Sequence, residues 1–182
     1  ILDNHPIDDI VRVEAIKGPA SVLYGKEAFG GVISLKTRQP RLGYNTNLEL
    51  SGGSYGNQNL HLYHSHKTDN FSYRLNASTK STDGFRDNSR QEANAVSGRI
   101  FKTINGNLKM VTGGQYRQVE WFDPGPVDDP RAEGDSTNGG EFTAFAVDVT
   151  LNNSYKSSHG QIVLYADNLE NEQYLDSKNI SN

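Results

Sequence analysis

Residues 7–37 read IDDIVRVEAIKGPASVLYGKEAFGGVISLKT, and the first half of this stretch predicts a strand that leads into a turn. From residue 11 to residue 16, small and β-branched side chains alternate with charged or longer ones, a period-2 pattern that is typical of a β-strand. Gly18 and Pro19 should end this strand, because proline suits the first position of a short helical turn.

The second half of the stretch predicts another turn and another strand. We expect a short helical turn over residues 20–24, ended by Gly25 in the left-handed conformation. Gly30 and Gly31 allow the backbone to bend sharply. The hydrophobic run at 32–35 then predicts a strand whose side chains need a cover.

Four phrases in this stretch together resemble the end of the plug domain of TonB-dependent outer-membrane receptors. They are Arg12-Val-Glu14, Gly18-Pro19-Ala-Ser, Leu-Tyr24-Gly25 and Gly30-Gly31-Val-Ile. A single Gly-Pro pair carries little information, whereas this ordered series is specific. The alternative is a small α+β subdomain that shares only the turn chemistry.

The composition of the 182-residue chain is unusual for a protein with a soluble core. Hydrophobic residues make up only 34%, while 18 glycines, 9 tyrosines and 7 phenylalanines accompany abundant Ser, Asn and Thr. A barrel that alternates lipid-facing apolar residues with lumen-facing polar ones gives this composition without any long apolar run. Disorder is the alternative, and the regular alternation argues against it.

Charge and cysteine content exclude several classes of protein. The 18 basic and 22 acidic residues are interspersed, so no basic stripe offers a surface for nucleic acid. The chain has no cysteine, which excludes a disulfide framework and a thiolate metal site. No apolar stretch approaches the length of a membrane helix, and no signal peptide opens the chain. Because Ile1 lies within the pattern that resembles the plug domain, the resemblance implies that the natural N-terminus precedes Ile1.

After the plug-like unit, alternation predicts about seven antiparallel strands. In the clearest of them Tyr73 and Leu75 share one face, which suits lipid, and Arg74 and Asn76 share the other, which suits water. The expected strands cover 44–51, 57–67, 71–80, 93–104, 107–120, 144–151 and 161–167, with long loops over 81–92 and 121–140 and a shorter connection over 152–160.

The expected fold is mainly β, with antiparallel up-and-down transmembrane β-barrel strands preceded by the end of a small α/β plug domain. Residues 1–40 would form the C-terminal part of the plug, and residues 41–182 a partial β-barrel. Residues 165–174 resemble the phrase that precedes the closing strands in this family. Plugged transporters of this class use roughly 22 strands, so the resemblance implies a heavily shortened receptor.

The resemblance implies a receptor in the outer membrane of a Gram-negative bacterium that takes up a scarce nutrient, with a ferric siderophore as the expected ligand. The other expected partners are outer-membrane lipid and TonB, which would act through a segment N-terminal to Ile1. No cofactor, metal or nucleic acid is expected. The alternatives are a receptor for cobalamin, haem or an oligosaccharide, a non-transporting fragment, and a soluble β-sandwich.

Charged residues on the predicted inner face suggest how a plug could be retained. We expect Arg12 and Glu14 to pair with inward barrel charges such as Glu49, Arg74 and Arg99 through charge-assisted hydrogen bonds. The alternative is that each of them is an ordinary hydrated charge of the lumen.

The predicted outer loops contain aromatic residues and arginines that could contact a ligand. These candidates are Tyr55, Phe85, Arg86, Arg90, Trp121 and Phe122. Aromatic rings beside arginines suit a ferric siderophore or another anionic, ring-bearing ligand. A membrane-interface belt explains several of the aromatic residues equally well.

The remaining motifs do not predict a metal site or an enzyme. His64 and His66 would share one face of a strand while His61 points to the other, so the three do not converge. The sequence has neither a Gly-x-Ser-x-Gly elbow nor a paired carboxylate and histidine constellation. We therefore do not expect catalysis.

Overall fold

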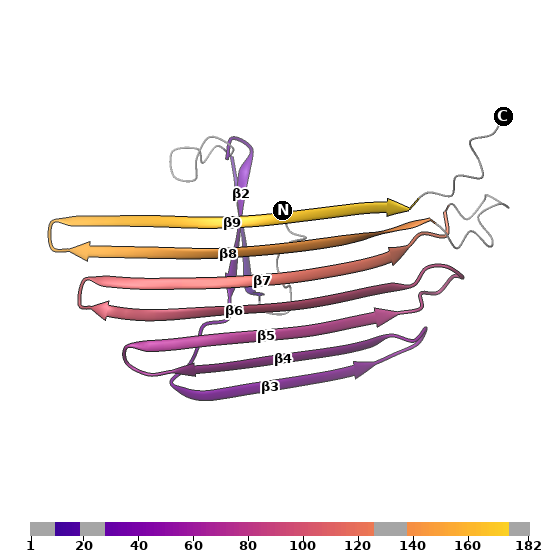
Figure 1. Ribbon diagram of the computed structural model, residues 1–182, viewed down its shortest axis with the longest axis horizontal. Coiled ribbons are helices and arrows are strands. Elements are labelled where there is room, and N and C mark those ends of the chain that lie inside the picture. Colours follow the sequence, from indigo (N-terminus) through magenta and orange to yellow (C-terminus); the bar gives the residue numbers. More distant parts are fainter. Residues whose placement is uncertain (1–9, 19–27, 126–137, 175–182) are drawn as a thin grey trace. The chain divides into compact units, whose positions relative to one another are not determined.

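The computed structural model describes residues 10–18, 28–125 and 138–174 (Figure 1). All regular secondary structure in these residues is β-strand. The described part contains no helix that is long and apolar enough to cross a membrane. The chain divides into two units, Ile1–Gln39 and Pro40–Asn182.

The first unit contains the two strands predicted from its alternation. β1 (Ile10–Lys17) and β2 (Gly31–Thr37) pair in antiparallel fashion. Gly31 has a φ of 145°, and a Cβ atom there would lie 2.6 Å from the carbonyl oxygen of Ile16, so the chain can enter β2 this way only with glycine. The helical turn expected over 20–24, together with Pro19, Tyr24 and Gly25, lies outside the described residues.

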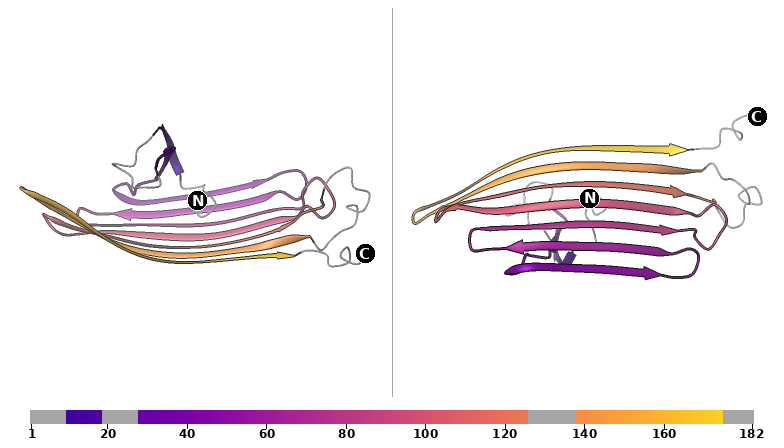
Figure 2. Two further views of the ribbon diagram at one scale, coloured as in Figure 1. Left: turned by 90° about the horizontal axis from the view of Figure 1, so that it is seen from above. Right: turned by 60° about the horizontal axis from the view of Figure 1, so that its bottom comes forward.

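The second unit contains a single sheet of seven antiparallel strands, each paired with its neighbours in the chain. Figure 2 shows how this up-and-down sheet curves along its strands. The strands are β3 (Gly43–Gly52), β4 (Gln58–Lys67), β5 (Phe71–Thr82), β6 (Gln91–Asn105), β7 (Leu108–Phe122), β8 (Gly139–Tyr155) and β9 (Ser158–Tyr174). Seven strands in this order confirm the prediction of an up-and-down meander.

The connection expected over 152–160 is wrong, because β8 continues to Tyr155 and β9 begins at Ser158. The run of Asn and Ser looks like a turn in the sequence, but its side chains pair across the two strands. Gln161 donates a hydrogen bond of 3.0 Å to Asn152, and the hydroxyl of Ser154 lies 2.9 Å from a ring nitrogen of His159. These cross-strand contacts replace the expected loop with a tight hairpin.

The end predicted for the last strand is also too early, because β9 runs to Tyr174 instead of residue 167. The phrase at 165–174 that resembles the approach to closing strands lies inside β9. It pairs with β8 along its length, from Tyr165 opposite Asp148 to Tyr174 opposite Gly139.

In the seven-stranded sheet, polar side chains are buried on one face and large apolar side chains are exposed on the other. A soluble protein has the opposite arrangement. On β5, Arg74 and Asn76 are only 8% and 6% exposed, whereas Leu75 between them is 50% exposed. The same outward face carries exposed large apolar residues on every strand, namely Leu48, Leu50, Leu60, Leu62, Val96, Ile100, Tyr116, Phe145, Val147, Val149, Ile162 and Leu164.

This arrangement has a clear energetic consequence. Burying a single large apolar side chain is worth about 1.5–3 kcal/mol, so a face of such residues in water would be strongly unfavourable. Among the described residues, the buried apolar side chains are only Ala28, Tyr63 and Ala144. The seven strands also form one sheet and not two facing sheets, which argues against the soluble β-sandwich.

Two neighbouring residues on β8 can test which face of the sheet contacts lipid. Val149 lies on the apolar face, and Thr150 points the other way. We expect Val149→Arg to destabilise the folded protein in lipid vesicles by about 2–4 kcal/mol, because a charge must enter hydrocarbon, and Thr150→Arg to have a smaller effect. Urea unfolding in vesicles measures both values. A larger loss for Thr150→Arg would contradict this assignment of the faces.

Candidate functional site

The polar face of the seven-stranded sheet carries an ion pair that spans three strands. Arg99 on β6 and Asp148 on β8 lie opposite the same residue of β7, Gly113. The guanidinium of Arg99 donates a hydrogen bond of 2.5 Å to the carboxylate of Asp148. A Cβ atom at position 113 would lie 2.8 Å from Nε of Arg99, so the glycine makes room for the arginine to cross β7.

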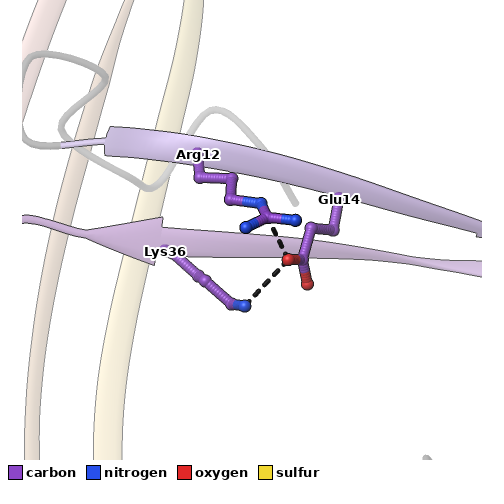
Figure 3. A network of polar contacts seen from close by, with 3 residues as sticks. All are labelled: Arg12, Glu14 and Lys36. Carbon is purple, nitrogen blue, oxygen red and sulfur yellow. Dashed lines mark hydrogen bonds and ion pairs between the residues drawn. The ribbon is translucent and has the colours of Figure 1, made fainter.

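The first unit carries a second charged cluster, which Figure 3 shows from close by. One carboxylate oxygen of Glu14 lies 2.9 Å from Nε of Arg12 and 2.8 Å from Nζ of Lys36. Two cations therefore share one carboxylate, and the cluster has a net charge of +1. Lys36 was missed by sequence reasoning, although the antiparallel pairing places it directly opposite Arg12.

The residues proposed to pair the plug with the barrel have contacts within their own units. Glu49 accepts a hydrogen bond of 2.5 Å from the side-chain amide of Asn47, and Arg99 binds Asp148. Arg74 is buried on the polar face, in register with Arg99 on the next strand. The expected pairing of Arg12 and Glu14 with these wall residues stays a prediction.

Two of the expected ligand contacts lie on exposed connections between strands. Tyr55, in the turn between β3 and β4, is 63% exposed, and Phe85, between β5 and β6, is 76% exposed. The two arginines of the second connection are already engaged. Arg86 donates to the carbonyl oxygen of Gly125 at 2.8 Å, and Arg90 forms an ion pair of 2.9 Å with Glu92.

Trp121 and Phe122 do not belong to a loop, because β7 extends through both of them. Trp121 lies opposite Gly140 of β8, and a Cβ atom on Gly140 would come within 2.6 Å of the indole ring. The ring therefore lies across the glycine at the end of the β7–β8 pair, and both aromatic side chains are half-buried. Their role as ligand contacts stays a prediction.

Residues 1–32 match the family model of the TonB-dependent receptor plug domain. The chain is 30% identical over 122 residues to the metal-pseudopaline receptor CntO of Pseudomonas aeruginosa, in a match that covers 65% of this chain and 17% of that receptor. It is 29% identical over 101 residues to the ferrioxamine receptor of Yersinia enterocolitica, covering 55% and 14%.

Among solved structures, the chain resembles the ferripyoverdine receptor of the outer membrane of Pseudomonas aeruginosa bound to ferripyoverdine. The TM-score is 0.70 at 21% identity, and the match covers 86% of this chain and 23% of that one. At this identity the likeness shows the fold alone. Over residues 1–32 the chain belongs to the TonB-dependent receptor plug family. It spans less than a fifth of the length of the two sequence relatives, which are named as receptors and not as enzymes.

The histidines of β4 lie on opposite faces of the strand, as their spacing predicts. His61 is buried on the polar face, while His66 on the apolar face stacks on Tyr44 with ring centroids 3.9 Å apart. The ring nitrogens of His64 lie 2.9 Å from the hydroxyl of Thr46 and 3.1 Å from that of Tyr73. Within the described residues, no group of three His, Cys, Asp or Glu side chains could hold a metal ion.

The ion pair between Arg99 and Asp148 should make the seven-stranded sheet sensitive to a side chain at Gly113. We expect Gly113→Ala to lower the stability by about 1 kcal/mol, because the new methyl group displaces Arg99 from Asp148. Gly114→Ala is the matched control, since a Cβ atom there meets Val147 at an ordinary 3.4 Å. Urea unfolding in vesicles gives both values.

A double-mutant cycle tests the same cause. In an Asp148→Asn background, Gly113→Ala should cost less, because Arg99 no longer has to hold its place above the glycine. An equal cost in both backgrounds would show that Gly113 serves another purpose.

Proposed function

We propose that the chain forms part of a receptor in the outer membrane of a Gram-negative bacterium that takes up a ferric siderophore with energy supplied through TonB. The observation that carries this proposal is the inverted sheet, with exposed apolar side chains on one face and buried polar ones on the other. Only a lipid environment stabilises such a wall. Residues 1–40 would be the end of the plug and residues 41–182 the wall.

The proposed ligand class rests on the names of the relatives. They are receptors for metal-pseudopaline, ferrioxamine and ferripyoverdine, each of which is a metal or iron bound to a small chelator. In this chain, the exposed rings of Tyr55 and Phe85 could stack on a ring-bearing chelator of this kind. Transport of an intact complex requires no bond chemistry, so the protein acts as a receptor and not as an enzyme.

A growth experiment tests the proposed ligand class. A strain that lacks the gene should fail to grow on at least one iron complex from a panel of ferrioxamine, ferripyoverdine and ferric enterobactin as sole iron source. The complete gene on a plasmid should restore growth only when TonB is present. Growth defects confined to cobalamin, haem or an oligosaccharide would replace the siderophore with that ligand.

Plug retention in this proposal depends on polar contacts. Arg12 and Glu14 would pair with inward wall charges such as Glu49, Arg74 and Arg99. Contacts of this kind can be broken without exposing apolar surface, which suits a domain that must move during transport.

Charge reversal at Glu14 tests the retention. Glu14→Lys turns a cluster of net charge +1 into three cations, so we expect a looser plug and greater sensitivity of cells to large antibiotics. Introducing Arg74→Glu or Arg99→Glu in the same protein should restore resistance if the charges meet. Unchanged sensitivity in Glu14→Lys would count against the pairing, and Glu14→Gln separates the loss of the carboxylate from the added charge.

A further inference from the structure

The described connections at one end of the seven-stranded sheet are bonded to one another as well as to their own strands. The amide of Asp83, after β5, donates a hydrogen bond of 2.8 Å to the carbonyl of Tyr55, in the turn after β3. The amide of Phe122, at the end of β7, donates one of 2.9 Å to the carbonyl of Arg90. These bonds link the turn after β3 to the connection after β5, and that connection to the last residue of β7.

Of these links, the one made by Arg86 joins residues that are furthest apart in the sequence. Its Nη1 atom donates a hydrogen bond of 2.8 Å to the carbonyl oxygen of Gly125, which lies 39 residues further along the chain. Gly125 is held in turn, since its amide donates at 2.9 Å to the side chain of Asp123. The guanidinium thus joins the connection after β5 to the connection after β7.

The backbone beneath Arg86 is fixed by Ser89. The hydroxyl of Ser89 accepts a hydrogen bond of 3.2 Å from the amide of Arg86 and donates one of 2.6 Å to its carbonyl oxygen. Gly84, with a φ of 77°, allows this close approach, because a Cβ atom there would overlap the same hydroxyl. The backbone of Arg86 is therefore held in one position, from which its side chain extends to Gly125.

Tyr55 shows that the linked connections hold an unfavourable conformation. Its φ of 60° lies in the left-handed region, which is costly for a residue with a large side chain. The carbonyl of Tyr55 accepts hydrogen bonds from the amide of Asp83 and from the hydroxyl of Thr82, at 2.8 and 3.2 Å. Contacts from the neighbouring connection thus keep the strained tyrosine in place with its ring exposed.

We propose that Arg86 is a positioning residue, which holds these connections together as one preformed platform and does not itself bind the ligand. Its side chain is directed at a main-chain carbonyl and is partly buried, whereas the rings of Tyr55 and Phe85 are exposed. The platform presents these two rings in fixed positions to a ring-bearing ligand. Only this last step rests on the proposed function, since the link to Gly125 exists without any ligand.

Amide hydrogen exchange of the ligand-free protein in detergent tests the positioning role. Arg86→Met keeps the length of the side chain but removes the donor, so exchange in peptides covering 83–90 and 122–125 should accelerate by on the order of tenfold or more. Arg86→Lys should restore slow exchange, because lysine can still donate to the carbonyl of Gly125. A residue whose purpose is to contact ligand would not change exchange in the absence of ligand.

Arg90→Met is the matched control, because it removes a charge from the same connection while its main-chain carbonyl can still bind Phe122. It should leave exchange at 122–125 unchanged. Ser89→Ala loosens the backbone of Arg86 without altering any charge, and it should accelerate exchange even if Arg86→Met fails to reach the membrane. Unchanged exchange in Arg86→Met, or equal acceleration in Arg90→Met, would overturn the proposal.

Growth on the siderophore panel then separates this inference from the proposed function. Accelerated exchange together with weaker growth supports the platform as the site of ligand capture. Accelerated exchange with unchanged growth supports the positioning role of Arg86 but contradicts the assignment of the platform to ligand capture.

Discussion

Every backbone N–H and C=O group of a wall that contacts lipid must find its partner within the wall, because hydrocarbon offers none. The seven-stranded sheet meets this requirement with long, nearly unbroken ladders, such as the one that pairs β7 with β8 from Leu108 to Phe122. Because the backbone groups are hydrogen-bonded within the sheet, successive side chains of a strand can face two different environments. Leu75 can then face lipid while Arg74 and Asn76 on either side of it face the polar interior.

Polar residues on the inner face and in the first unit are joined by contacts that depend on register. Arg99 reaches Asp148 because Gly113 stands between them on the intervening strand, and Glu14 meets Lys36 because β1 and β2 pair at that level. At the end of the sheet, Arg86 extends the same principle to the connections. These polar contacts stiffen each unit without adding apolar surface.

The sequence predicted the strands best where the two faces differ most, as in residues 71–80, because alternation of apolar and charged side chains has no other simple explanation. It failed over 152–160, where Asn and Ser favour a turn by composition but bind across a hairpin. The partners of Arg86 and Arg99 lie 39 and 49 residues away, so no local pattern could reveal them. Arg86 lies on the connection between β5 and β6 and Arg99 on the polar face of β6, but only the three-dimensional structure shows their contacts.

Lipid on one face of the sheet and water on the other can be detected directly with spin labels. The chain contains no cysteine, so single cysteines at positions 72 to 77 can carry a spin label whose access to oxygen and to a water-soluble nickel complex is measured in vesicles. We expect labels at 73, 75 and 77 to meet oxygen preferentially, and labels at 72, 74 and 76 to meet nickel. The reverse pattern, or no alternation at all, would contradict this assignment of the two faces.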